Sequence, residues 1–198
     1  SNNTIGSEVG ASTNLIAGNT TAGIEIQGAA TGNKIFNNQI GTDTSGALGV
    51  PNGQGIRIDG TGGAGSTQIG SASFFSGNDI AGNNFAGIAL LATNNNAILG
   101  NRIGGYSDGF TDYGNGGEGI VIQGGSSNNV IGDGTFAGEN EIFFNGADGI
   151  LISGSTSVSN SIQQNSIFQN AGKGIRLANE ANLLIAPPIL DPLSLIHL

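Results

Sequence analysis

Isoleucine recurs along the chain in two short phrases, and these set its pattern of hydrophobic and polar positions. The phrase Asn-x-Ile begins at residues 3, 14, 33, 38, 78, 96, 101, 129, 140, 160 and 165, and Thr67 opens one variant. The phrase Gly-Ile-x-Ile, ending twice in Leu, begins at residues 23, 55, 87, 119, 149 and 174. Alternate residues of a β-strand share one face, so Asn and Ile of the first phrase point to the same side, as do the two apolar residues of the second. The pattern predicts many short strands, each with one buried face.

The order of these strands repeats six times. First strands begin at residues 3, 33, 67, 96, 129 and 160, second strands at 14, 38, 78, 101, 140 and 165, and third strands at the six Gly-Ile phrases. The offset from first to second strand alternates between 11 and 5 residues, so a pair of coils is the larger repeat. A single coil cannot bury its own Ile side chains, but stacked coils can. The spacing predicts an all-β fold, a right-handed parallel β-helix of about six coils of three short strands.

We expect a core built almost entirely of isoleucine. Of the 24 inward positions, 22 are Ile and the other two are Leu90 and Leu177. Such β-branched side chains suit a pleated, buried surface. The Asn side chain both donates and accepts hydrogen bonds, so the Asn residues of successive coils are predicted to stack into ladders at the corners. Frequent Gly and Asn residues also disfavour helices.

The repeat carries a resemblance to a known fold family. Its phrases, Asn-x-Ile-x-x-Asn and Gly-Ile-x-Ile-x-Gly, cover about residues 3–178 and resemble the right-handed parallel β-helix repeats of bacterial surface and secreted proteins, within the pectin-lyase-like superfold. That superfold includes polysaccharide lyases, hydrolases and epimerases, as well as many adhesin and filler repeats. The catalytic motifs of those enzymes cannot be matched to this chain, whose one histidine, His197, lies outside the repeat. No catalytic residue is predicted.

The repeat also defines the expected domain organisation. Residues 1–178 are predicted to form the β-helix, and residues 179–198 an irregular C-terminal tail with two prolines at 187 and 188. We favour a tail that caps the last coil, although it could also pack along a flank, meet another chain or begin a following segment. Because the chain starts inside a repeat, without Met or a signal peptide, we interpret it as a mature or excised piece of a longer protein.

Charge and composition narrow the classes of partner. Fourteen acidic and five basic residues give a net charge of -9, and the basic residues are scattered singly. Such a surface repels phosphate groups, which argues against nucleic acid as a partner. No apolar run approaches the roughly 18 residues of a membrane-spanning helix, so no membrane insertion is expected. The chain has no cysteine, which excludes disulfides and thiolate metal sites.

Two long loops hold the candidate ligand-binding residues. Residues 42–54 and 105–118 connect second to third strands in the second and fourth coils, and loops on rigid scaffolds often carry function. Their acidic residues could bind Ca²⁺ and their tyrosines could stack on sugars, although such residues also serve as turn formers and flank cover. No other cofactor or metal is expected. The candidates are Asp43, Tyr106, Asp108, Asp112, Tyr113 and Glu118.

Outward positions give two further expectations. Glu25 is expected to pair with Arg57, and Arg102 is expected to lie between two acidic side chains of neighbouring coils. Apolar residues also point outward and form either a contact surface or a face covered by a neighbouring loop. They are Ala89, Leu91, Val121 and Leu151 on third strands, and Phe36, Leu99, Phe143 and Phe168 elsewhere.

These observations favour a non-catalytic, extracellular or cell-surface β-helix segment that acts as a rigid structural, adhesive or assembly module. The expected partner is a polysaccharide or another surface protein. The alternative is a carbohydrate-binding or polysaccharide-acting protein of the lyase, hydrolase or epimerase type, using the 42–54 and 105–118 loops. A third hypothesis is self-association through the terminal coils.

Overall fold

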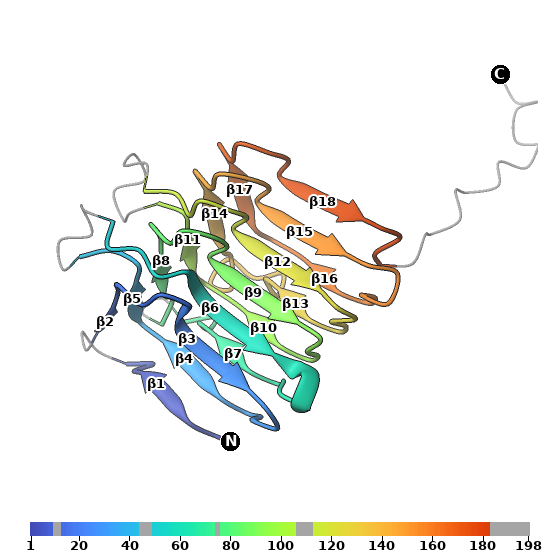
Figure 1. Ribbon diagram of the computed structural model, residues 1–198, viewed down its shortest axis with the longest axis horizontal. Coiled ribbons are helices and arrows are strands. Elements are labelled where there is room, and N and C mark those ends of the chain that lie inside the picture. Colours follow the sequence, from blue (N-terminus) through green and yellow to red (C-terminus); the bar gives the residue numbers. More distant parts are fainter. Residues whose placement is uncertain (10–12, 44–48, 74–75, 106–112, 183–198) are drawn as a thin grey trace, which may run out of the picture.

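The chain folds into a stack of coils, each made of three short strands (Figure 1). The computed structural model describes residues 1–9, 13–43, 49–73, 76–105 and 113–182. The first sheet contains β1 (Thr4–Gly6), β4 (Lys34–Phe36), β7 (Gln68–Ile69), β10 (Ala97–Ile98), β13 (Val130–Ile131) and β16 (Ser161–Ile162). The second contains β2 (Asn14–Ile16), β5 (Asn38–Ile40), β8 (Asp79–Ile80), β11 (Arg102–Ile103), β14 (Glu141–Phe143) and β17 (Ser166–Phe168). The third contains β3 (Ala22–Gln27), β6 (Gln54–Asp59), β9 (Ile88–Leu91), β12 (Ile120–Gln123), β15 (Ile150–Ser153) and β18 (Ile175–Ala178).

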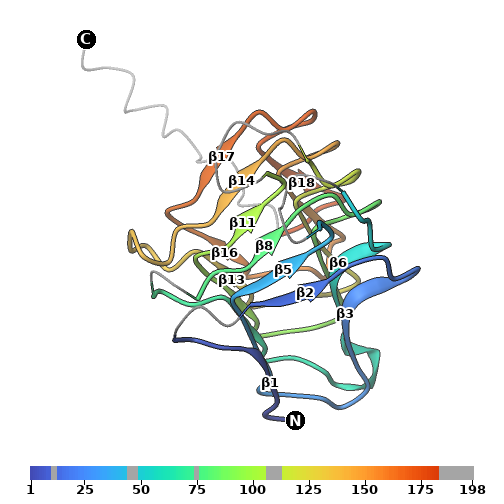
Figure 2. The ribbon, with the colours of Figure 1, turned by 90° about the vertical axis from the view of Figure 1, so that its left-hand side faces the viewer.

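Every strand pairs in parallel with the strand three places along the chain. The second sheet, for example, runs β17-β14-β11-β8-β5-β2 and faces the viewer in Figure 2. The register places Ile on Ile, as in Ile40 on Ile80, so each inward row continues through the stack. The predicted right-handed parallel β-helix of six three-stranded coils is therefore confirmed. One short 3₁₀ turn, η1 (Gly60–Gly62), interrupts the β structure of the described residues.

The predicted isoleucine core is present. The inward Ile side chains of the second to fifth coils, together with Leu90, are fully buried in one continuous cluster. In the sixth coil, Ile175 and Leu177 are 47% and 55% exposed, because no further coil among the described residues covers them. The core is therefore closed along its length and open, over the described residues, at the sixth coil.

The predicted asparagine ladders are also present. At the corner before the second sheet, the Nδ2 of each Asn donates to the Oδ1 of the Asn one coil further on, as in Asn101 to Asn140 at 3.0 Å. At the corner before the first sheet, Thr67 interrupts the ladder and leaves the buried Nδ2 of Asn33 without a hydrogen-bond partner. This ladder continues beyond the sixth coil, where the Oδ1 of Asn182 accepts from the backbone N–H of Asn160 at 3.0 Å. Residues 183–198 of the predicted tail lie outside the described residues.

A third ladder, which the sequence interpretation missed, lies at the corner between the second and third sheets. It consists of Asn19, Asn52, Asn83, Asn115, Asn145 and Asn170, linked by side-chain bonds of 2.8–2.9 Å. Its members precede the Gly of Gly-Ile by four residues in five coils and by three in the second coil, a regularity visible in the sequence. All three corners are thus fixed by side-chain amides.

The outward residues of the sheets form ion pairs at some positions and an apolar cluster at others. The expected ion pairs are confirmed: Arg57 binds Glu25, and Arg102 lies between Asp79 and Glu141 at 3.0 and 2.9 Å. The apolar side chains of Ala86, Ala89 and Val121, with Leu151 partly buried beside them, pack into a small cluster on the outer face of the third sheet.

Two outward phenylalanines are buried rather than exposed. Phe36 and Phe143 are each only 1% exposed. The Phe143 ring stacks on Phe168 with centroids 4.9 Å apart, and a side chain at Gly105 would overlap it. Phe143 is buried because the start of the 105–118 loop and the next coil cover its ring.

Candidate functional site

The bend between the second and third sheets, called here the third corner, is where the candidate site lies. In the first, third, fifth and sixth coils, two residues separate the last Ile of the second strand from the ladder Asn. The residue just before that Asn has a positive φ in all four coils: Gly18, Gly82, Phe144 and Gln169, with φ of 75°, 71°, 59° and 52°. In the second and fourth coils the two long loops are inserted at this point.

The two long loops meet at Gly82 of the third coil. The N–H of Gly82 donates to the carbonyl of Tyr113, at the end of the 105–118 loop, at 2.6 Å. On the other side, a side chain at Gly82 would lie 3.3 Å from the Cα of Gly49 and 2.9 Å from the carbonyl of Gly41. Both long loops were expected to leave the same corner. Their described parts do so, and both contact Gly82.

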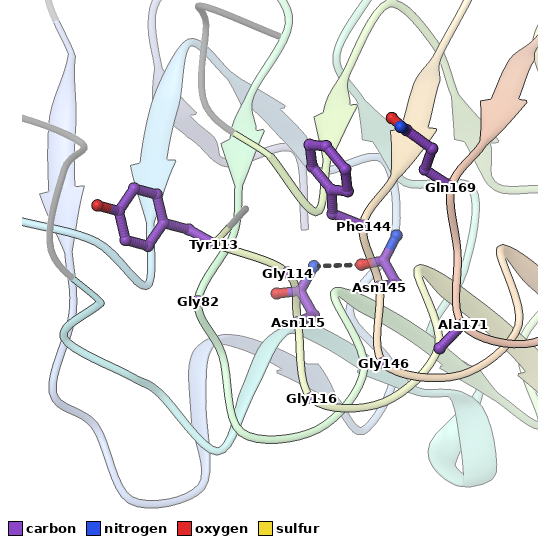
Figure 3. Close-up of a pocket in the computed structure, with 10 residues that line it drawn as sticks. All are labelled: Gly82, Tyr113, Gly114, Asn115, Gly116, Phe144, Asn145, Gly146, Gln169 and Ala171. Atoms are coloured by element: carbon purple, nitrogen blue, oxygen red, sulfur yellow. Dashed lines mark hydrogen bonds between the residues drawn. The ribbon is translucent and has the colours of Figure 1, made fainter. Parts of the chain in front are cut away.

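A shallow depression of about 490 Å³ follows the third corner from Gly82 to the sixth coil (Figure 3). We call it the corner groove. Its three most prominent side chains are Tyr113, Phe144 and Gln169, which extend from the 105–118 loop, the fifth coil and the sixth coil (Figure 3). The other lining residues are Gly82, Gly114, Asn115, Gly116, Asn145, Gly146 and Ala171. None of these side chains carries a charge.

The floor of the corner groove is rigidly held. The Nδ2 of Asn115 donates to the Oδ1 of Asn145 at 2.9 Å (Figure 3). The Nδ2 of Asn145 donates in the same way to Asn170 at 2.8 Å. The Phe144 ring stands edge-on against Phe143, with centroids 5.3 Å apart and an interplanar angle of 60°. Buried rings in such geometry stabilise one another. The exposed part of Phe144 therefore rests on an ordered base.

The predicted site residues are only partly brought together. Tyr113 lines the corner groove, whereas Asp43 and Glu118 are not among the described lining residues. Asp43 accepts a hydrogen bond at its main-chain carbonyl from the Gln39 side chain, and the Glu118 carbonyl accepts from the N–H of Gly87 at 3.0 Å. Three further candidates, Tyr106, Asp108 and Asp112, lie outside the described residues, so the Ca²⁺ hypothesis that depends on them stays a prediction.

Two groove residues were missed as candidates. Phe144 and Gln169 stand in short corners, not in long loops, and the search for candidates followed loop length. The sequence did hold a signal for them, because the equivalent positions in the first and third coils are Gly18 and Gly82. Large side chains stand in two of the four short corners, where the other two have glycine.

The described carboxylates with a resolved pKa shift are engaged in local structure. Desolvation at the surface of the second sheet raises the pKa of Asp79, while its ion pair with Arg102 opposes that rise. Hydrogen bonds from Thr61 lower the pKa of Asp59, and those from Thr135 lower the pKa of Asp133. Across the described residues, no group of three or more His, Asp or Glu side chains is arranged to hold a metal ion.

Comparison with protein-family models, with curated proteins and with solved structures found no match for the chain. Within the described part of the chain, no helix is long and apolar enough to cross a membrane.

Proposed function

We propose that this chain is a non-catalytic β-helix segment that works outside the cell or at its surface, as a rigid structural, adhesive or assembly module. The observation that carries the proposal is the engagement of the repeated polar residues in architecture. Asn78, Asn101 and Asn140 are each about 1% exposed or less and are bonded to the coils on both sides. Residues used in this way are not free to bind or transform a ligand.

The distribution of charged groups supports the same proposal. Glycoside hydrolysis needs two carboxyl groups on either side of one bond, with one pKa raised. Asp79, the described carboxyl with a raised pKa, and Glu141, the acidic group that acts on it, are both bound by the Arg102 side chain. This arrangement is that of a surface ion-pair row on the second sheet.

Rigidity follows from the three ladders and the continuous core. Each coil adds backbone hydrogen bonds in three sheets and one amide at nearly every corner, so a coil cannot rotate without breaking its neighbours' bonds. Parallel strands are about 4.8 Å apart, so six coils make a rod of about 29 Å. A module of this kind holds an attached group at a set distance and orientation.

A polysaccharide panel tests the proposal. The chain is incubated with neutral and uronic-acid polysaccharides, and mass spectrometry and reducing-end assays follow the soluble products. We expect no turnover of any substrate. Turnover that disappears on substitution of a single Asp or Arg residue would contradict the non-catalytic proposal. Labelling of intact source cells with an antibody to the chain tests the proposed location, and labelling only after permeabilisation would contradict it.

Carbohydrate binding without catalysis is a second candidate function, favoured by the corner groove. The aromatic rings of Tyr113 and Phe144 and the exposed amide of Gln169 are groups with which proteins hold sugars by stacking and hydrogen bonding. An adhesive module needs such a contact surface.

A further inference from the structure

We infer that the corner groove binds an extended, uncharged oligosaccharide, and that Phe144 and Gln169 are its principal contact residues. The inference rests on the carbohydrate-binding function and adds to it the residues, the class of sugar and the shape of the ligand.

The first argument is backbone strain. Phe144 and Gln169 have φ of 59° and 52°, in the left-handed region that costs a side chain free energy and that Gly18 and Gly82 occupy in equivalent corners. Glycine would fit the fold better at both positions. The same backbone occurs at Gln164 and at other corners of the stack, and what sets Phe144 and Gln169 apart is that their side chains line the groove.

The second argument is the shape of the groove. In Figure 3, Tyr113 points away from Phe144, and Gln169 lies on the other side of that ring. The three side chains come from successive coils, Tyr113 from the fourth, Phe144 from the fifth and Gln169 from the sixth. Two coil steps correspond to about 10 Å at the usual strand spacing. Groups in a row of this length fit an extended chain better than one small compact molecule.

The third argument is hydrogen bonding at the groove floor. The N–H groups of Gly116, Gly146 and Ala171 already donate to Asn83, Asn115 and Asn145 of the preceding coils at 2.8–2.9 Å. A peptide that bound by adding a strand would need such groups to be available. Recognition therefore falls to the aromatic rings and the side-chain amide, which suits sugars with their apolar ring faces and hydroxyl edges.

The fourth argument is charge. The described groove side chains are uncharged, and the chain as a whole carries a net charge of -9. A polyuronate would be repelled by this field and would meet no described cation in the groove. The expected ligand is therefore a neutral glycan, and its affinity should change little with salt.

Two glycine variants and one matched control test the inference. Phe144→Gly and Gln169→Gly remove the contact groups and also relieve the strained backbone, although Phe144→Gly gives up the edge-on contact with Phe143 as well. Gln164→Gly is the control, because Gln164 is exposed, has φ of 49° and precedes a ladder Asn in the same coil as Gln169, but does not line the groove. Melting temperatures of all three variants are measured alongside binding.

Binding is measured by calorimetry with neutral hexaoses (β-1,4-, β-1,3- and α-1,4-glucans, xylan and mannan), with the matching disaccharides, and with hexagalacturonate. We expect at least one neutral hexaose to bind, its disaccharide to bind more weakly, and hexagalacturonate not to bind. Phe144→Gly and Gln169→Gly should each weaken binding about tenfold or more, and Gln164→Gly should leave it unchanged.

The outcomes separate the inference from the function on which it rests. If no glycan binds, both the carbohydrate-binding function and the inference are wrong. If hexagalacturonate binds as well as or better than the neutral sugars, the class of ligand is wrong. If a neutral hexaose binds equally well to wild type, Phe144→Gly and Gln169→Gly, the chain binds carbohydrate but the placement of the site is wrong.

Discussion

Gly119, which directly precedes β12 of the third sheet, lies against Ile142 of the second sheet in the next coil. A Cβ built at Gly119 would be 2.6 Å from the Cγ2 of Ile142 and 2.7 Å from the carbonyl oxygen of Gly149. Real Cβ atoms do not approach so closely, so the glycine of Gly-Ile is required by packing at the third corner. Its φ is not positive, so the requirement is steric and not conformational.

We predict that Gly119→Ala lowers the free energy of unfolding by about 1–3 kcal/mol, the usual cost of overfilling a packed core. Gly174→Ala is the matched control, because the nearest atom to its Cβ would be 3.6 Å away. That substitution should change stability by less than about 0.5 kcal/mol. Urea unfolding of the two variants measures both values, and equal losses would show that steric contact is not the reason for the glycine.

Thr67→Asn should stabilise the fold by repairing the interrupted ladder. The Nδ2 of Asn33 and the Oγ1 of Thr67 are both buried without a hydrogen-bond partner, whereas each intact step of the ladder makes a side-chain bond, as in Asn96 to Asn129 at 2.8 Å. A buried hydrogen bond contributes about 1 kcal/mol, so we expect a gain of that size.

Thr93→Asn is the control for this repair. Thr93 is also buried, but its hydroxyl donates to the Ala64 carbonyl at 2.8 Å and accepts from Asn96 at 3.1 Å, so its replacement should destabilise the fold. Thermal melts of both variants test this expectation. A melting temperature of Thr67→Asn below that of wild type would contradict the ladder account.

Asp133 should make stability depend on pH in the acid range. Thr135 donates to its carboxylate through N–H and hydroxyl at 2.9 and 2.6 Å and so lowers the pKa below the usual value of 3.8. A lowered pKa contributes stability that is complete above pH 3.8 and is lost as the pH falls through the folded-state pKa. We therefore expect wild type to be more stable than Asp133→Asn at pH 7, with the difference shrinking below pH 3.8. A difference that stays constant with pH would contradict this assignment.

Asp79 should show the opposite trend. Desolvation raises its pKa in spite of the Arg102 ion pair, so its protonated form is favoured by folding. Its contribution is lost as the pH rises from 3.8 through the raised folded-state pKa. Relative to Asp79→Asn, wild type should therefore gain stability as the pH falls through this range. Unfolding curves at several pH values measure the trend, and a gain with rising pH would contradict it.

Much of the fold followed from the inward residues, because a period of two in a strand and a fixed order of three strands leave few arrangements. Ile40 on Ile80 and Asn101 on Asn140 could both be predicted from spacing alone. The burial of Phe143 could not, since it depends on the path of a loop from the preceding coil across Gly105.

The candidate site was harder to predict than the fold. Tyr113 was found because it lies in a long loop, whereas Phe144 and Gln169 were missed because their corners are short. Their importance becomes visible only when the corner is aligned with Gly18 and Gly82, whose positive φ shows what backbone that position requires. Backbone conformation decides which of two neighbouring side chains lines a groove. The spacing of hydrophobic residues in the sequence carries no information about that conformation.

The central claim is that the fixed residues of Asn-x-Ile build the architecture while the residue between them lies on the surface. Adjacent positions test it most directly. The Asn101 amide donates to the Ile69 carbonyl at 2.8 Å and links Asn78 to Asn140, whereas the neighbouring Arg102 side chain is 29% exposed and binds Asp79 and Glu141.

The decisive measurement is the free energy of unfolding of Asn101→Ala and Arg102→Ala in urea. We predict a loss of about 2–4 kcal/mol for Asn101→Ala, because several buried polar groups lose their partners. We predict a loss of at most about 1 kcal/mol for Arg102→Ala, as for other surface ion pairs. A larger loss for Arg102→Ala than for Asn101→Ala would contradict the account.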